Sequence, residues 1–217
     1  MADRELDRLP PGRQPGWLKL LVSGFFRLAY GGVEVSGLEG VPRQGPLIVA
    51  PTHRSYLDPI ILSAFLPRVF YYMAKSELFE QPLLRPVLRF FGVFPVDRGA
   101  ARGSTFRTAL RLLRLGGAVV VFPEGGIVEK TGDGMKAGVG ALASMSAAPV
   151  LPVYLAGSNT LFSWPEALSD SPWLVLRVAP PIAPPAMRGR EAREEVTRRV
   201  MEALAELERA PGGGASG

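Results

Sequence analysis

Short runs of apolar, largely β-branched residues alternate along the chain with segments in which apolar residues recur at helical spacing. The runs predict strands and the longer segments predict helices, so the alternation indicates an α/β sandwich. The predicted strands are 33–36, 47–50, 69–73, 118–122, 150–155 and 174–179. The predicted helices are 17–30, 59–66, 105–115, 136–146 and 191–209. No internal repeat or interior linker divides this series, and 217 residues fit one sizeable domain.

The two ends of the chain differ in composition from this central series. Residues 1–15 are polar and contain prolines, which predicts a loose arm. The glycine-rich residues 211–217 predict a disordered tail. Between them we expect an amphipathic helix over residues 16–31, followed by one folded domain over residues 32–210.

The segment 17–30 has two unlike sides when it is drawn as a helix. The apolar positions at helical spacing are Leu18, Leu21, Val22, Phe25 and Leu28. Lys19, Ser23 and Arg27 fall four residues apart on the other side. A helix with aromatic residues and a basic polar side is suited to a membrane interface. A helix packed on a protein core has the same periodicity, so the sequence leaves both interpretations open.

The formal net charge is +5, and the segment 68–114 alone carries nine Lys and Arg against three Asp and Glu. A basic middle segment in an otherwise near-neutral chain predicts an anionic partner, which is a phosphate group, an anionic lipid surface or a nucleic acid. For most of these arginines, a solvated helix face is the simpler interpretation.

The composition excludes several classes of protein. There is no cysteine, which excludes disulfide scaffolds, thiolate metal sites and cysteine nucleophiles, and the single histidine argues against a histidine-rich zinc site. Asp3, Glu5 and Asp7 stand where a secretory signal has basic residues. No apolar run is long enough to predict a bilayer-spanning helix. We therefore expect a protein on the cytoplasmic side of the cell membrane, peripheral or monotopic.

His53 and Asp58 lie in a loop that follows a predicted strand and precedes a predicted helix. Across such a loop the carboxylate can fold back and accept a hydrogen bond from the imidazole. That contact would fix the tautomer of His53 and leave its other ring nitrogen able to take a proton. Alternatively, Asp58 caps the helix that begins at Pro59, and the histidine is structural.

Three further blocks carry candidate site residues. Arg98, held in a turn beside Asp97, can present its guanidinium to a phosphate group, or it forms a surface ion pair. Glu124 stands at the end of an apolar strand in a glycine-rich loop, which is typical of binding sites on open α/β sheets but also of an exposed turn. Residues 148–157 read as a core strand, although two prolines in them favour an edge position or a bulge.

Together and in this order, the four blocks resemble those of the glycerolipid acyltransferase family, most closely its bacterial lysophosphatidic acid (1-acylglycerol-3-phosphate) acyltransferases. The resemblance extends over about residues 33–179. The matching positions are His53 and Asp58 in the first block, Arg98 in the second, Glu124 and Gly125 in the third, residues 150–153 in the fourth, and Lys75 before the second block.

This resemblance implies a single domain with a mixed β-sheet flanked by helices. It implies transfer of a fatty acyl group from acyl-CoA or acyl-carrier protein to the free hydroxyl of a lysophospholipid at the membrane surface, with phosphatidic acid as the product. His53 would be the general base and Asp58 the residue that orients it. No metal or other cofactor is implied.

The resemblance also implies how the acceptor is held. Arg98 and Lys75 would bind its anionic head group, while Glu124 and the adjoining Gly125 would position its glycerol or organise the loop. The oxyanion donors are not assigned by the sequence.

The third block departs from the family at one point. The family has Thr or Ser and then a second phosphate-binding arginine after the Phe-Pro-Glu-Gly run, whereas this chain has Gly126 and Ile127. Either Lys130 or Lys136 takes the place of that arginine, or the acceptor is a lysolipid or alcohol other than lysophosphatidic acid.

Three other classes of function remain as alternatives. An esterase would use Ser55 with His53, but the chain has no Gly-x-Ser-x-Gly motif. A non-catalytic protein that binds anionic lipid would explain the charge and the amphipathic helix, yet not the His53 block. A nucleic-acid-binding protein would interleave aromatic residues with its arginines, and this basic segment does not.

Overall fold

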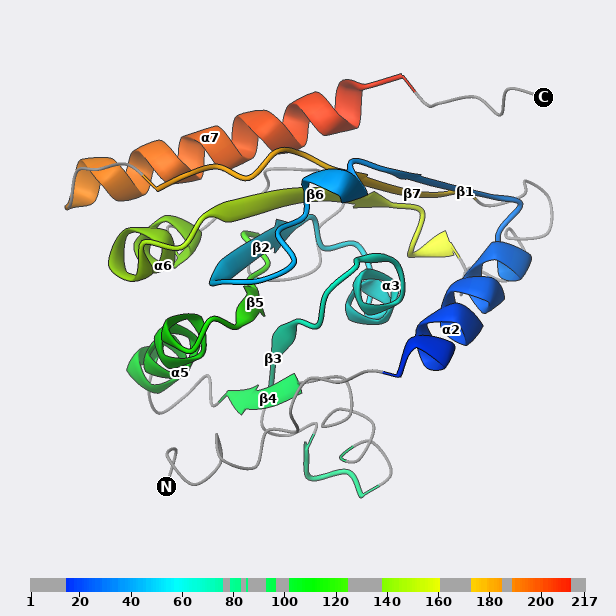
Figure 1. Ribbon diagram of the computed structural model, residues 1–217, viewed down its shortest axis with the longest axis horizontal. Coiled ribbons are helices and arrows are strands. Elements are labelled where there is room, and N and C mark those ends of the chain that lie inside the picture. Colours follow the sequence, from blue (N-terminus) through cyan, green and yellow to red (C-terminus); the bar gives the residue numbers. More distant parts are fainter. Residues whose placement is uncertain are drawn as a thin grey trace.

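A β-sheet of seven strands forms the centre of the protein (Figure 1). The computed structural model describes residues 15–75, 79–82, 85, 93–96, 102–124, 138–160, 173–184 and 189–211. The strands are β1 (Gly32–Ser36), β2 (Leu47–Pro51), β3 (Tyr71–Lys75), β4 (Val93–Val96), β5 (Ala118–Val120), β6 (Val150–Ala156) and β7 (Trp173–Val178), in the order β1-β7-β6-β2-β5-β3-β4. Neighbouring strands are parallel except β6 and β7, so the expected mixed sheet is confirmed.

Helices cover both faces of this sheet. They are α2 (Gly16–Ala29), α3 (Asp58–Phe65), α5 (Arg102–Arg114), α6 (Gly138–Ser146) and α7 (Arg190–Arg209), with a short 3-10 turn, η1 (Leu38–Gly40). In Figure 1 the sheet separates α2 and α3 from α5, α6 and α7. Each helix lies within a few residues of its predicted position, since apolar residues recur in it at helical spacing.

The middle strand β2 shows why the two faces form one domain. All five of its residues are buried. Leu47 and Val49 pack in the core under α2 and α3, whereas Ile48 and Ala50 pack in the core under α5, α6 and α7. Side chains alternate between the faces of a strand, so a strand buried on both faces is apolar throughout.

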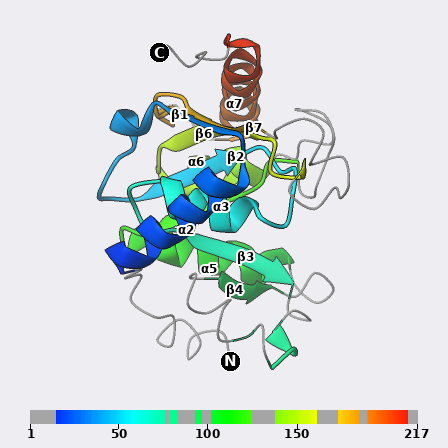
Figure 2. The same cartoon turned by 90° about the vertical axis from the view of Figure 1, so that its right-hand side faces the viewer.

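The N-terminal helix α2 packs against α3, beside which it lies in Figure 2. Phe26 is the buried residue of α2, and its ring lies 6.5 Å from that of Phe65 on α3. The Lys19 ammonium donates hydrogen bonds to the carbonyl oxygens of Leu66 (2.8 Å) and Arg68 (3.1 Å), just beyond the end of α3. Burial lowers the pKa of Lys19. This side of α2 is therefore part of the fold.

The opposite side of α2 carries a stripe of large apolar side chains that no described residue covers. The stripe consists of Trp17, Leu20, Leu21, Phe25 and Leu28, whose exposed fractions range from 58% to 90%. One side of α2 therefore joins the core, and the interpretation of the exposed side as a membrane-interface surface stays a prediction. Among the described residues, no helix is long and apolar enough to cross a bilayer.

The strand β4 was missed by the sequence pattern because Pro95 interrupts it. Proline lacks the N–H that a central strand needs, and among the described strands β4 pairs with β3 alone, at the edge of the sheet.

The expectation that proline places residues 148–157 at an edge or in a bulge is wrong, since β6 lies between β7 and β2. The carbonyl oxygen of Pro152 accepts a hydrogen bond from the N–H of Ala179 at 3.1 Å. The nitrogen of Pro152 faces the same side, where β7 has already ended at Val178. The missing donor therefore affects at most the one bond opposite Ala179, just beyond the end of β7.

One arginine of the basic segment 68–114 has a structural role. The Arg68 guanidinium donates hydrogen bonds to the carbonyl oxygens of Pro42 (3.1 Å), Gly45 (2.5 Å) and Gly116 (2.7 Å). Gly45 precedes β2 and Gly116 precedes β5, so Arg68 joins the two strands at their amino ends. Burial lowers the pKa of Arg68. For this residue, neither an anionic partner nor a solvated face is the explanation.

Candidate active site

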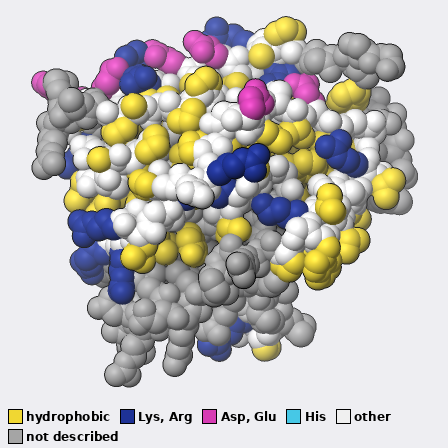
Figure 3. Space-filling model, in the orientation of Figure 1, with side chains coloured by type: hydrophobic (Ala, Val, Ile, Leu, Met, Phe, Trp, Pro, Cys, Tyr) yellow, Lys and Arg dark blue, Asp and Glu magenta, His cyan; other side chains and the backbone are white. Residues whose placement is uncertain are grey.

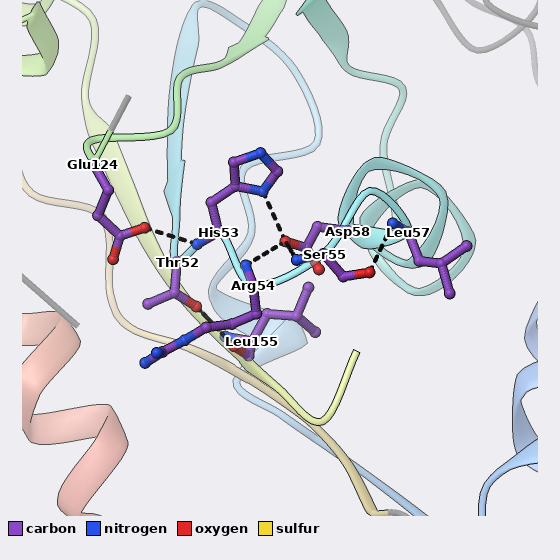
Figure 4. A network of polar contacts seen from close by, with 8 residues as sticks. All are labelled: Thr52, His53, Arg54, Ser55, Leu57, Asp58, Glu124 and Leu155. Carbon is purple, nitrogen blue, oxygen red and sulfur yellow. Dashed lines mark hydrogen bonds and ion pairs between the residues drawn. The ribbon is translucent and has the colours of Figure 1, made fainter. Parts of the chain in front are cut away.

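The first sequence block lies in the loop between β2 and α3. Residues 52–57 of this loop follow the carboxyl end of β2, which is flanked by the parallel strands β5 and β6. In open α/β sheets, ligands bind beyond the carboxyl ends of the strands. The polar contacts of this loop are drawn in Figure 4.

His53 and Asp58 are in direct contact, as their spacing across the loop predicts. The distance between His53 Nδ1 and Asp58 Oδ2 is 2.8 Å. The Asp58 side chain is fully buried, and 16% of the His53 side chain is exposed. Because Nδ1 donates to the carboxylate, Nε2 is left as the acceptor nitrogen of the neutral imidazole, and no described residue hydrogen-bonds to it.

The Asp58 carboxylate also organises the loop itself. Its Oδ2 atom accepts hydrogen bonds from the backbone N–H groups of Arg54 (2.7 Å) and Ser55 (2.9 Å). Asp58 was predicted to cap the helix as an alternative, but α3 begins at Asp58 and its cap residue is Leu57, with no side-chain cap. The carboxylate points back into the loop instead, where two backbone donors hold it against the imidazole.

Two residues of the third block contact His53 from the carboxyl end of β5. The backbone N–H of His53 donates to Glu124 Oε2 at 2.8 Å, and the Glu124 side chain is buried. The ring of Phe122 stacks on the imidazole, with 3.9 Å between the ring centroids and 23° between the planes. Of the two roles foreseen for Glu124, this geometry favours organisation of the loop.

Thr52 is a contributor to the site that the sequence reasoning missed. Its hydroxyl donates to the carbonyl oxygen of Leu155 and accepts from the N–H of the same residue, both at 2.8 Å. The side chain thereby continues the pairing of β2 with β6 up to the residue before His53. The sequence feature that could have indicated this role is a β-branched polar residue directly after a fully apolar strand.

Ser55, the nucleophile of the esterase alternative, has a local role. Its hydroxyl oxygen accepts a hydrogen bond from the backbone N–H of Leu57 at 3.2 Å. The adjacent imidazole nitrogen, His53 Nδ1, is engaged by Asp58. This arrangement does not provide the serine–histidine contact that an esterase needs.

Of the remaining predicted residues, Lys75 lies in the described part of the chain. Lys75 is the last residue of β3, pairs in register with Val96 of β4, and lies at the same edge of the sheet as His53 because β2, β5, β3 and β4 are parallel. Two strand spacings separate β3 from β2, which is about 10 Å. Residues outside the described part of the chain are Arg98, Gly125, Gly126, Ile127, Lys130 and Lys136. Binding of the acceptor by Lys75, Arg98 and Gly125 stays a prediction.

Comparison with known proteins agrees with this arrangement. The chain is 34% identical over 133 residues to the 1-acyl-sn-glycerol-3-phosphate acyltransferase of Bacillus subtilis, covering 60% of this chain and 65% of that protein. It is 29% identical over 135 residues to the protein of the same name from Streptococcus pneumoniae, covering 60% and 50% respectively. The chain thus spans between half and two thirds of the length of these relatives.

A solved structure has the same fold. The crystal structure of the 1-acyl-sn-glycerophosphate acyltransferase PlsC from Thermotoga maritima superposes with a TM-score of 0.69 at 24% identity, covering 89% of this chain and 79% of that one. The sequence model of the family named Acyltransferase matches residues 32–156. This match takes in more than half of the chain, including His53, Asp58 and Glu124, and the chain therefore belongs to the Acyltransferase family.

Proposed function

We propose that the protein transfers a fatty acyl group from acyl-CoA or acyl-carrier protein to the free hydroxyl of 1-acylglycerol-3-phosphate, which gives phosphatidic acid. The observation that carries the proposal is the His53–Asp58 pair, with Nδ1 on a buried carboxylate and Nε2 directed away from it. The names of the bacterial relatives support the choice of acceptor.

The reaction follows from the chemistry of this pair. His53 Nε2 removes the proton of the acceptor hydroxyl as that oxygen attacks the thioester carbonyl carbon. Asp58 holds the imidazole in position and stabilises its protonated form. The carbon–sulfur bond then breaks, an ester bond remains, and the imidazolium returns the proton to the departing thiolate. A thioester is already activated, so the reaction needs no covalent acyl-enzyme.

The proposal is tested with purified protein, radiolabelled acyl-CoA or acyl-carrier protein, and a panel of lysolipids, with the products separated by chromatography. We expect labelled phosphatidic acid to form from lysophosphatidic acid, and little free fatty acid to form without an acceptor. Release of fatty acid without an acceptor would instead identify an esterase. Absence of any labelled product with either donor would contradict the proposed function.

Binding of the acceptor's phosphate group is expected to depend on Arg98. A guanidinium gives a permanently charged, bidentate contact, and Ile127 stands where the family has a second arginine. Replacing Arg98 with alanine should raise the KM for lysophosphatidic acid by the equivalent of about 1.5–3 kcal/mol, which is roughly 10- to 150-fold, and should change the KM for the acyl donor much less.

The control for this prediction is an acceptor without a phosphomonoester, together with the variant Ile127→Arg. That variant should improve the use of lysophosphatidic acid relative to the neutral acceptor. If Arg98→Ala impairs both acceptors equally, Arg98 stabilises its turn and does not bind phosphate.

We further propose that the exposed stripe of α2 binds the membrane surface that supplies the acceptor. Hydrophobic side chains gather in Figure 3 over the position that α2 has in Figure 1. The helix has no acidic residue, and its exposed Arg27 favours an anionic lipid surface. Since acyl-CoA and acyl-carrier protein are intracellular donors, we propose the cytoplasmic face of the cell membrane as the site of this activity, with the protein peripheral or monotopic.

Replacing Phe25 and Leu28 with serine is expected to release the protein from anionic vesicles without unfolding it. Full burial of a Phe or Leu side chain in an apolar phase is worth about 1.5–3 kcal/mol. Even partial insertion of the two side chains should therefore give the wild type a vesicle affinity at least roughly tenfold higher than that of the variant. Phe26 is left unchanged because it is buried. Cosedimentation with vesicles measures the effect, and circular dichroism checks the fold.

The matched control is Leu115→Ser, since Leu115 is 75% exposed between α5 and β5. Its vesicle binding should equal that of the wild type. Equal binding of the Phe25/Leu28 variant and the wild type would show that α2 does not meet the membrane.

A further inference from the structure

The side chain of Arg54 links the loop of the candidate active site to the C-terminal helix. Arg54 Nη2 lies 3.5 Å from Glu208 Oε1 on α7, and 11% of the Arg54 side chain is exposed. In Figure 4 this side chain extends away from the imidazole of the neighbouring His53. A largely buried arginine directly after the proposed general base therefore contacts a residue 154 positions further along the chain.

The part of α7 that carries Glu208 is itself fixed to the sheet. The guanidinium of Arg177 on β7 donates hydrogen bonds to the carbonyl oxygens of Leu207 (2.7 Å) and Ala210 (2.6 Å) at the end of α7. The same guanidinium forms an ion pair with Glu34 of β1 at 2.6 Å. Glu208 thus extends from a helix end that two strands hold in place.

Tyr154 of β6 lies beside this ion pair. Burial and the neighbouring Glu208 carboxylate raise the pKa of Tyr154. The Glu208 carboxylate is therefore close to β6 as well as to the loop.

The backbone of Arg54 acts on the catalytic pair. Its N–H donates to Asp58 Oδ2 at 2.7 Å, and the N–H of Ser55 donates to the same atom at 2.9 Å. We propose that Arg54 is a positioning residue, whose ion pair with Glu208 holds the loop so that these two N–H groups keep Asp58 against His53. The proposal rests on the proposed acyl transfer.

The energy of the Arg54–Glu208 ion pair decides whether its loss should affect stability or catalysis more. A partly exposed ion pair contributes little to the free energy of unfolding. Small displacements of catalytic groups, in contrast, cost up to about 100-fold in rate. The pair should therefore affect catalysis far more than it affects stability.

Steady-state kinetics with both substrates tests the proposal. Arg54→Met is expected to lower kcat about tenfold while both KM values stay within about twofold of the wild type. Arg54→Lys, which keeps the charge, should recover part of the rate. The double variant Arg54→Glu with Glu208→Arg, which exchanges the two charges, should have a higher kcat than either single variant. If Arg54→Met fails to fold, the lysine variant and the exchanged pair decide the question.

The matched control is Arg198→Met on the same helix. Arg198 pairs with Glu195 (2.7 Å) and Glu202 (2.6 Å) along the exposed side of α7. Its removal deletes an ion pair of shorter distance that does not involve the loop. Its kcat should equal that of the wild type.

Amide hydrogen exchange provides a measurement that does not need activity. The N–H groups of Arg54 and Ser55 should exchange faster in Arg54→Met than in the wild type, and at the wild-type rate in Arg198→Met. Unchanged exchange in Arg54→Met overturns the proposal, and so does an unchanged kcat in an active enzyme. A wild-type protein that transfers no acyl group overturns the proposed function instead, while the exchange rates still decide whether Glu208 holds the loop.

Discussion

Replacing His53 with alanine is expected to lower kcat by about 10²–10⁴-fold, the usual loss when a general base is removed. His53 is the only histidine of the chain, so no second imidazole can take over the proton transfer. The fold should survive, because the loop also depends on the backbone N–H of His53, which still donates to Glu124, and on the two backbone donors to Asp58.

The measurement is single-turnover acyl transfer at saturating acceptor, together with thermal unfolding and vesicle binding of the same variant. The imidazole ring stacks on Phe122 and leaves a space of its own shape when it is removed. Added imidazole should therefore restore part of the lost rate. A variant that retains kcat within a few-fold of the wild type would exclude His53 as the base.

Replacing Asp58 with asparagine is expected to lower kcat by roughly 10³-fold or more, as the loss of the carboxylate that orients a catalytic histidine does elsewhere. The neutral amide cannot stabilise the imidazolium. The site is also unfavourable for an amide. In the wild type, Asp58 Oδ2 accepts three hydrogen bonds, while Oδ1 is buried without a hydrogen-bond partner among the described residues. In either orientation, the asparagine NH₂ group meets donors or finds no partner.

Nitrogen NMR of His53 in the Asp58→Asn variant would reveal the expected change of tautomer. The comparison variant is Asp58→Ala, which leaves the N–H groups of Arg54 and Ser55 unpaired. Each unpaired buried group costs about 1–3 kcal/mol, so this variant should lose stability as well as activity. Wild-type kcat in Asp58→Asn would show that the contact with His53 is structural.

The sequence predicts the fold well wherever one physical cause dominates. The apolar run of β2 predicts a strand because both of its faces are buried, and α7 is predicted by its apolar spacing. The pattern fails for β4 and for the place of β6 in the sheet, because the effect of a proline depends on which neighbour its missing N–H would face. That neighbour is set by strand order, which the local sequence does not contain.

The contacts of the candidate site also differ in whether the local sequence predicts them. The His53–Asp58 contact could be predicted because only a short stretch of loop separates the two residues. The contact between His53 and Glu124 could not, since it requires β2 and β5 to be neighbours. On α2, large apolar side chains occur on the buried side and on the exposed side, so periodicity predicts the helix but does not distinguish the buried Phe26 from the exposed Phe25.

Two hydrogen bonds of the site join residues that are far apart in the chain, with 71 positions between His53 and Glu124 and 103 between Thr52 and Leu155. During synthesis, the histidine leaves the ribosome long before these partners exist. The loop can take its final form only after β5 and β6 have been made and have paired with β2. A partly synthesised chain therefore carries the histidine without the finished geometry of its loop, which arises late, in the same event that closes the centre of the sheet.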